Sequence, residues 1–344
     1  MDLADATVLV DCRWIGFSGI GRATELLIRS LAAVRPVGRW ILWGPDTLEH
    51  VAWPGASVDS ERRDPHELLG MRGILSRPKH DVAIYPDQLR PPGRAPAVQY
   101  LQDVTPIATE CRRVPRAAKR RYFQCLARAA IVISPSDMAA MDIAALLRRP
   151  RERFQVFTYP YDADLGRRVA RLRDNETAST DVLFVGRAAP HKNLDRLVAA
   201  HREARVKGCG RLVLVGPGTE AYDDPVHAIH GLGEVSQETL DERMAAAAAL
   251  VLPSLREGFG LPVIEAQAAG LPVLASSALP LLDLLVAGWD VSFDPYDVSS
   301  IAYALAAPSM GRVPAPGLRP VTAPTFEEHG SFIMACVERA LGSG

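Results

Sequence analysis

Two glutamates stand in the segment best equipped for chemistry, LVLPSLREGFGLPVIEAQAAGLPVLASS (250–277). A strand is expected to end at Ser254, and Pro262 stands after a glycine-rich loop where the first helical residue is expected. The unpaired N–H groups and the dipole at such a helix start favour an anion such as a phosphate. Glu257 in the loop and Glu265 in the expected first turn are unsuited to that anion, but they can accept hydrogen bonds from sugar or ribose hydroxyls. Alternatively, both glutamates only favour the helix dipole.

Two basic residues lie in a second strand, loop and helix pattern, VLFVGRAAPHKNLDRLVAA (182–200). Arg187 offers a bidentate guanidinium and Lys192 a point charge, and both kinds of cation bind phosphates. Together with helix N–H groups, they can neutralise the charge of a phosphate group. Taken alone, either residue is more typical of a solvated surface. His191 is expected to be a loop residue without a catalytic role.

Glycines and an aspartate mark two further loops. Gly16, Gly19 and Gly21 follow the first apolar run, a pattern found in many Rossmann-like turns and therefore weakly specific. Asp103 lies in QDVTPI (102–107), where its carboxylate either orients an acceptor or sugar or caps the turn before the proline.

These segments resemble, in order and over nearly the whole chain, the retaining glycosyltransferases of family 4, which have the GT-B fold. The most specific match is the pattern Glu, seven residues, Glu within EGFGLPVIEAQAAGLPV. The other matches are the family's GIGR loop (10–32), Asp-x-Thr-Pro segment (102–107), Ser-x-Ser segment (132–143), phosphate loop (182–200), following strand and turn (212–218) and base-binding turn with its helix (231–254). Within the family, the motifs look most like those of bacterial mannosyl- and rhamnosyltransferases.

The resemblance implies a catalytic set of four residues. Arg187 and Lys192 would bind the donor diphosphate, Glu257 would contact the transferred sugar, and Asp103 would orient acceptor or sugar. Retaining enzymes of this fold generally show no convincing protein nucleophile, so no covalent residue is expected. The departing phosphate would instead take the acceptor's proton on the same face of the sugar. Neither a metal ion nor a separate cofactor is expected.

The resemblance also implies residues that bind the substrates. Glu265 would hold the ribose, and Gln102 would lie with Asp103 on the acceptor or sugar side. Gly19, Gly21 and Arg22 would face the donor phosphates across the cleft. The remaining donor contacts would be Gly186, Val235, Gly258, Phe259, Gly260 and Leu261.

Two departures from the family pattern affect these expectations. The family's histidine before Asp103 is Gln102 here, which keeps hydrogen bonding but removes a titratable group. A histidine-dependent proton step is therefore not expected. Where the family often has Pro-Glu, this chain has Pro280 and Leu281, so either the donor sugar differs or the loop is built differently.

Buried apolar runs alternate with helical patterns along two stretches of the chain, which predicts the α/β class with parallel sheets. The expected strands are 7–11, 82–85, 131–136, 182–186, 211–216, 250–254 and 272–276, and the expected helices are 23–34, 194–206, 236–249 and 262–270. With the resemblance, they indicate a GT-B fold of two Rossmann-like domains whose parallel sheets face each other across a cleft. Met138 and Met141 are expected in the core.

The domains are predicted from composition and the same resemblance. Residues 1–165 would form an acceptor-side Rossmann-like domain and residues 166–324 the nucleotide-sugar donor domain. The charged stretch 148–180 is expected to link them. Thr325 and Glu328 form a capping-box pattern, so residues 325–344 are expected to form a helix, which in the family returns to the N-terminal domain.

Composition excludes several classes of protein. The 344 residues are 48% apolar and 23% charged, which is typical of soluble globular chains and not of disordered ones. A net charge of −1 argues against a nucleic-acid partner. Five cysteines without a CxxC pair, and no apolar run of membrane-spanning length, favour a cytoplasmic protein.

A basic cluster in 112–121 suggests a peripheral membrane contact. Arg112, Arg113, Arg116, Lys119, Arg120 and Arg121 lie close together, and on a helix several would share a face. Such a face could bind an anionic inner leaflet or a phosphorylated lipid acceptor. A solvated face in an arginine-rich chain is an equal alternative.

The sequence therefore predicts a retaining glycosyltransferase that moves a hexose from a nucleotide diphosphate sugar to a hydroxyl. GDP-mannose, or a related GDP or dTDP sugar, is the first expectation for the donor. The acceptor is a saccharide, a lipid-linked molecule or a small molecule, the last also through an atom other than oxygen. A non-catalytic nucleotide-sugar-binding protein is the main alternative. A dinucleotide oxidoreductase ranks below both because the first turn lacks an uninterrupted GxGxxG.

Overall fold

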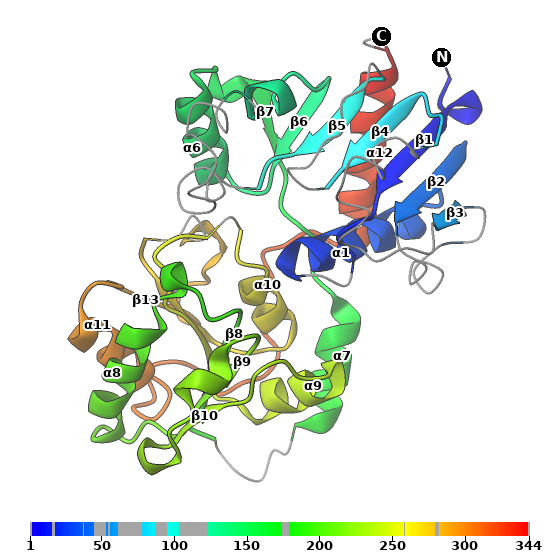
Figure 1. The fold of residues 1–344 in the computed structure, drawn as a ribbon. Helices are drawn as coiled ribbons and strands as arrows, with labels where there is room; N and C mark the ends of the chain where they lie inside the picture. Colours follow the sequence, from blue (N-terminus) through cyan, green and yellow to red (C-terminus); the bar gives the residue numbers. More distant parts are fainter. Residues whose placement is uncertain are drawn as a thin grey trace. The chain divides into compact units, whose positions relative to one another are not determined.

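The fold is given by a computed structural model that divides into two compact units (Figure 1). The N-terminal unit comprises Met1–Pro160 and Pro324–Gly344, and the C-terminal unit comprises Tyr161–Ala323. The structure describes residues 2–15, 18–36, 38–44, 53, 56–60, 78–86, 95–102, 121, 123–173, 179–257, 259–278 and 282–342. Each unit is described by itself.

The N-terminal unit is built on a parallel sheet of seven strands in the order β3-β2-β1-β4-β5-β6-β7. Their bounds are β1 Thr7–Asp11, β2 Arg39–Gly44, β3 Ala56–Ser60, β4 Val82–Tyr85, β5 Ala97–Tyr100, β6 Ile131–Ser134 and β7 Phe154–Val156. Strands β4 and β5 are buried throughout, as expected where helices cover both faces of a parallel sheet. The helices are α1 Ser18–Val34, α6 Asp137–Leu147 and α12 Phe326–Gly342, with short 3₁₀ turns at Leu3–Asp5 and Arg151–Arg153.

The last helix, α12, packs against α1 although the two lie at opposite ends of the chain (Figure 1). The capping box is present, because Glu328 N–H donates to Thr325 Oγ1 and Thr325 N–H donates to Glu328 Oε2. At the contact, a Cβ on Gly330 would lie 2.2 Å from the carbonyl oxygen of Ser30. Only glycine therefore permits this close approach of the two helices.

A buried histidine fastens α12 to the sheet side of the unit. His329 Nδ1 lies 2.9 Å from Ser30 Oγ, and its Nε2 lies 3.3 Å from Tyr100 Oη. Burial lowers the pKa of His329 from 6.5 to about 3, because the charged imidazolium would lose its hydration. The side chain is therefore neutral at every physiological pH.

The C-terminal unit carries a parallel sheet of six strands in the order β10-β9-β8-β11-β12-β13. The strands are β8 Val182–Val185, β9 Leu212–Val215, β10 Ile229–Gly231, β11 Ala249–Leu252, β12 Val273–Ser276 and β13 Val291–Phe293. The helices are α7 Ala163–Leu172, α8 Leu194–Arg205, α9 Gln237–Ala246, α10 Leu261–Ala268 and α11 Val298–Leu305, with 3₁₀ turns at Pro190–Lys192, Thr219–Tyr222, Pro225–His227 and Leu282–Leu284. This strand order is the one of the Rossmann fold.

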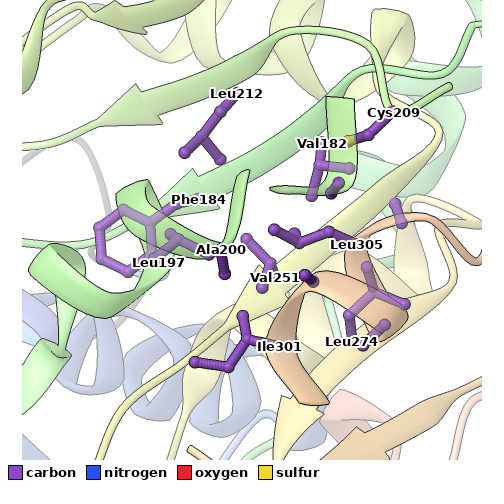
Figure 2. Close-up of a cluster of buried hydrophobic side chains, with 14 of the residues drawn as sticks. Val182, Phe184, Leu197, Ala200, Cys209, Leu212, Val251, Leu274, Ile301 and Leu305 are labelled. Atoms are coloured by element: carbon purple, nitrogen blue, oxygen red, sulfur yellow. The ribbon is translucent and has the colours of Figure 1, made fainter. Parts of the chain in front are cut away.

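One apolar core joins the C-terminal sheet to two of its helices (Figure 2). Phe184 and Val251 project from neighbouring strands toward Leu197 of α8 and Ile301 of α11. All four side chains are fully buried. These contacts place the first turn of α8, which follows the predicted phosphate loop, directly over the middle of the sheet.

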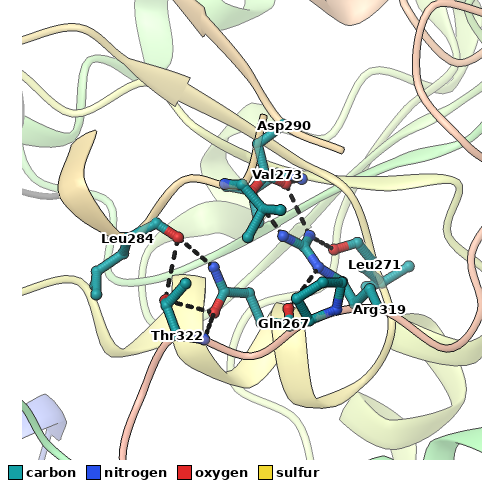
Figure 3. A network of polar contacts seen from close by, with 9 residues as sticks. Gln267, Leu271, Val273, Leu284, Asp290, Arg319 and Thr322 are labelled. Atoms are coloured by element: carbon teal, nitrogen blue, oxygen red, sulfur yellow. Dashed lines mark hydrogen bonds and ion pairs between the residues drawn. The ribbon is translucent and has the colours of Figure 1, made fainter. Parts of the chain in front are cut away.

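A buried polar network joins the segment 308–324 to the rest of the C-terminal unit (Figure 3). Arg319 donates two hydrogen bonds to the Asp290 carboxylate, at 2.8 and 2.7 Å, and a third at 2.6 Å to the carbonyl oxygen of Leu271. On α10, Gln267 donates to the carbonyl oxygen of Leu284 and accepts from Thr322. The proline- and glycine-rich segment 308–324 is thereby tied to α10 and β12.

The predicted linker 148–180 is wrong over most of its described length. Its first part forms β7, which completes the N-terminal sheet, and its second part forms α7, whose Leu165 and Val169 are buried. The spacing of these two residues, four apart, is the helical pattern that the surrounding arginines obscured. Because α7 packs on α9 and α10, the C-terminal unit begins at Tyr161, ahead of the predicted residue 166.

The placement of two methionines in the core is also wrong. Met138 and Met141 on α6 are 40% and 47% exposed, while Ala140, Ile143 and Leu147 of the same helix are buried. The buried alanines, Ile143 and Leu147 form the packed face of the helix, so Met138 and Met141 lie on its outward face.

We expect His329 to make the stability of the N-terminal unit depend on pH. The unfolded chain binds a proton near pH 6.5 and the folded chain only near pH 3, so stability falls as the pH drops below 6.5. Between pH 7 and pH 5 the loss amounts to about 2 kcal/mol. His329→Gln should remove this part of the pH dependence.

Urea unfolding followed by tryptophan fluorescence at pH 7 and pH 5 measures the effect, because four of the five tryptophans (Trp14, Trp40, Trp43 and Trp53) lie in the N-terminal unit. An equal loss of stability in wild type and His329→Gln would contradict the assignment.

Candidate functional site

The predicted donor residues gather at the carboxyl edge of the C-terminal sheet, around strands β8 and β11. These two strands are neighbours in the sheet, and the connections that follow them lead to opposite sides of the strand order. Such a topological switch point is where open α/β sheets bind ligands. Described residues from the predicted set at this edge are Gly186, Arg187, Lys192, Val235, Glu257, Phe259, Gly260, Leu261 and Glu265.

At this edge, Lys192 and Glu257 form an ion pair between the loops that follow β8 and β11. Lys192 Nζ donates to Glu257 Oε1 at 2.5 Å, and the side chains are 18% and 11% exposed. Ser254 Oγ, which is buried, donates to the same carboxylate oxygen at 2.6 Å. The backbone adds a bond between the two loops, from Leu255 N–H to the carbonyl oxygen of His191 at 2.8 Å.

The pair is arranged for ligand binding as well as for holding the loops together. Both hydrogen bonds to Glu257 end on Oε1, so Oε2 has no partner among the described residues and can accept from a hydroxyl. The Lys192 ammonium has three donors and gives one to Glu257, which leaves donors for an anion. One site can therefore bind a hydroxyl and a phosphate side by side.

Backbone bonds connect the loops after β8, β9 and β10. Ala188 N–H donates to the carbonyl oxygen of Pro217, and Gly216 N–H donates to that of Gly233. A Cβ on Gly216, whose φ is +129°, would lie 2.3 Å from the Gly186 carbonyl oxygen. Arg187 is held in this backbone while its side chain stays exposed, so the structure brings it to the edge but does not pair it with Lys192 or Glu257.

Helix α10 begins at this edge with a glycine. Gly260 is the N-cap in the left-handed region, with φ +75°, and no side chain caps the helix. Pro262 occupies the second helical position, so the Leu261 N–H is a donor available near the start of the helix. Glu265 is half-buried and stands in the second turn, not in the predicted first turn, because the helix begins one residue earlier than expected. Gly258 lies outside the described residues.

The predicted residues of the N-terminal unit have a different setting from the one expected. Gly19 and Gly21 lie in the first turn of α1 and Arg22 begins the second, so none of them is in a loop. Arg22 pairs with Glu25 at 3.0 Å. Gln102 follows β5, and its amide donates to the carbonyl oxygen of Pro86 and to Tyr159 Oη, both at 3.1 Å. Their position toward the donor stays a prediction. Gly16, Asp103, the 112–120 part of the basic cluster, Pro280 and Leu281 lie outside the described residues.

Sequence reasoning missed three polar groups at the two carboxyl edges. In the N-terminal unit, Asp11 and Arg13 form a buried bidentate pair at the end of β1, with the guanidinium 4.7 Å from the Trp43 ring centroid. In the C-terminal unit, the missed residues are Ser254 and the buried Asn193. The available signal was position, since Asp11 ends a strand, Arg13 and Ser254 lie two residues beyond one, and Asn193 caps the start of a helix.

Among the residues that the structure describes, no group of three or more histidine, cysteine, aspartate or glutamate side chains is placed to hold a metal ion. Within the same residues, no helix has both the length and the apolar character needed to cross a bilayer.

Comparison with known proteins relates the C-terminal unit to a family of glycosyltransferases. Residues 179–307, all within the C-terminal unit, match the family described as glycosyl transferases group 1. O-antigen chain mannosyltransferase B of Escherichia coli is 28% identical over 204 residues, which cover 54% of this chain and 53% of that protein. The C-terminal unit thus resembles group 1 glycosyltransferases over residues 179–307.

Other curated relatives align over shorter stretches. D-inositol 3-phosphate glycosyltransferase of Mycobacteroides abscessus is 33% identical over 159 residues, which cover 43% of this chain and 34% of that protein. The chain thus spans about half the length, or less, of the curated relatives that it matches.

The fold of the chain is GT-B. The crystal structure of Anabaena Alr3699/HepE in complex with UDP and glucose superimposes with a TM-score of 0.66 at 16% identity, covering 98% of this chain and 96% of that one. The two parallel sheets of seven and six strands are those of GT-B glycosyltransferases, which confirms the predicted fold class.

The close approach of Gly216 to Gly186 provides a test of how the edge is built. We expect Gly216→Ala to destabilise the C-terminal unit by at least about 2 kcal/mol more than the same substitution at a glycine in open space. At both positions alanine must adopt a strained φ, but at Gly216 the neighbouring backbone must also move. Gly288→Ala is the matched control, since Gly288 has φ +80° with nothing within 4 Å of an added Cβ. Thermal unfolding of both variants measures the difference, and equal midpoints would contradict this account of the edge.

Proposed function

We propose that this protein is a retaining glycosyltransferase that moves a hexose from a nucleotide diphosphate sugar to an acceptor hydroxyl. The observation that carries the proposal is the Lys192–Glu257 ion pair at the switch point of a group 1 glycosyltransferase domain. A cation for the diphosphate and a carboxylate for the sugar lie beside an uncapped helix start. The cation and the helix start suit the diphosphate of a nucleotide sugar, and the carboxylate suits the hydroxyls of its sugar.

In the proposed mechanism, Lys192 and Arg187 neutralise the charge that develops on the departing diphosphate. Donors near the start of α10 contribute from the other side, with Leu261 N–H among them. Glu257 Oε2 accepts from a hydroxyl of the transferred sugar, and Glu265 holds the ribose. The departing phosphate takes the acceptor's proton on the same face, so neither a covalent protein nucleophile nor a metal ion is part of the proposal. Asp103 orients the acceptor or the sugar.

GDP-mannose is the first proposed donor. One relative bears the name mannosyltransferase, which supports mannose as the sugar. UDP sugars are the competing donors because the HepE structure contains UDP and glucose. Base selection would fall to the turn after β10, where Val235 is half-buried. The proposed acceptor is a saccharide, a lipid-linked molecule or a small molecule on the cytoplasmic side.

A non-catalytic nucleotide-sugar-binding protein is the second candidate. It is favoured by Gln102, whose amide is engaged by Pro86 and Tyr159 and offers no titratable group beside Asp103. This candidate predicts donor binding with neither transfer nor hydrolysis. Slow hydrolysis of any nucleotide sugar by the wild-type protein would exclude it.

The donor is found first with a thermal-shift panel of nucleoside diphosphates and their sugars, with and without magnesium, because a ligand that binds only the folded state raises the midpoint. With that donor, we expect Glu257→Ala to lower the transfer or hydrolysis rate at least about 100-fold, since a contact to the reacting sugar is lost. The midpoint shift given by the nucleoside diphosphate alone should persist.

Glu242→Ala, which removes an exposed glutamate on α9, is the matched control and should keep the wild-type rate. Unchanged turnover in Glu257→Ala would show that the proposed sugar contact is wrong.

A further inference from the structure

Asn193 lies directly after Lys192 and connects three loops of the C-terminal unit. Its side-chain Nδ2 donates to the carbonyl oxygen of Pro253 at 3.1 Å and to that of Pro295 at 2.8 Å. Pro253 follows β11 and Pro295 follows β13, while Asn193 itself stands between the loop after β8 and helix α8. The residue is 5% exposed, so these bonds are shielded from water.

The orientation of this amide is fixed from both ends. Arg196 Nη1 donates to Asn193 Oδ1 at 2.9 Å, which directs Nδ2 toward the two carbonyl groups. The backbone of Asn193 has φ +60° and ψ +31°, a left-handed conformation that asparagine tolerates better than most residues. An asparagine therefore satisfies two demands here, a left-handed turn and a buried double donor.

The effect of these bonds is to set the distance between the two members of the ion pair. Lys192 precedes Asn193, and Glu257 follows Pro253 in the loop after β11. A further backbone bond between these loops runs from Leu255 N–H to the His191 carbonyl oxygen. With Asn193 in place, the lysine and the glutamate are held by backbone and not only by their mutual attraction. Their separation would then persist when a ligand phosphate competes for the Lys192 ammonium.

We propose that Asn193 is a positioning residue that holds Lys192 opposite Glu257 during transfer. This inference rests on the proposed function, in which Lys192 stabilises the departing diphosphate. A misplaced cation costs more in the transition state than in the bound ground state, because charge develops on the leaving group only as the sugar departs. Asn193 should therefore affect kcat more than KM.

The test compares Asn193→Gly with wild type. Glycine keeps the left-handed backbone and removes both bonds to the carbonyl groups. With the donor from the thermal-shift panel, we expect kcat to fall about tenfold or more and KM to change less than about twofold. In a Lys192→Met background, adding Asn193→Gly should change the remaining rate less than about twofold, because the group that it positions is gone.

Asp241→Asn is the matched control for loss of a buried polar contact. Asp241 is 3% exposed and accepts from Arg168 and Gln237, away from the edge. This variant should lower the thermal midpoint and keep kcat. A purely structural role for Asn193 would lower the rate by the same factor with and without Lys192, and that result would overturn the proposal, as would an unchanged kcat.

Hydrogen exchange separates this proposal from the proposed function. In Asn193→Gly, the peptide that contains Leu255 should exchange faster than in wild type, while Asp241→Asn should leave it unchanged. Unaltered exchange in Asn193→Gly would overturn the positioning role whether or not the protein shows transfer. A wild-type protein without transfer or hydrolysis would contradict the proposed function, and the exchange result would still decide whether Asn193 holds the two loops.

Discussion

The ion pair between Lys192 and Glu257 is the contact on which the candidate site depends. The attraction between the two opposite charges draws the loops after β8 and β11 together. The pair still leaves one carboxylate oxygen and further ammonium donors for a ligand. Because both side chains are mostly buried, their attraction is screened less than that of a surface pair.

The rest of the C-terminal unit keeps this pair in position. The core of Figure 2 places α8, and with it Lys192, over the sheet. The network of Figure 3 fixes the far end of α10 through Gln267, with Arg319 and Asp290 paired nearby at almost no exposure. Breaking such a buried pair leaves a charge without a partner, which is strongly destabilising. The start of α10, near Glu257, is thus set by contacts at its opposite end.

The elements that sequence reasoning found are those whose patterns are local. Strands β1, β4 and β8 are continuous apolar runs, and the Thr325 capping box is a pair of residues three apart, so each could be recognised without knowledge of the fold. Short strands such as β7, β10 and β13 have only three residues, and their identity depends on neighbours in the sheet. The helix α7 was hidden by its arginines, and Met138 was misplaced because hydrophobicity does not show which face of α6 packs.

In the candidate site, too, local patterns could be recognised from the sequence and tertiary contacts could not. Glu257 and Lys192 could be named from their loop contexts, but their direct contact is a tertiary fact that no spacing reveals. Asn193 and Ser254 escaped notice because an asparagine and a serine beside a strand are common turn residues. Their importance lies in which carbonyl or carboxylate they reach across the sheet edge.

Calorimetric titration of the nucleoside diphosphate that stabilises the wild-type protein most would test the central claim, that Lys192 binds the donor diphosphate. Lys192→Met should weaken this binding about tenfold or more, the loss typical of a charge-assisted hydrogen bond, while Lys207→Met, which removes an exposed lysine of the same unit, should leave it unchanged. Equal affinities in wild type and Lys192→Met would contradict the account.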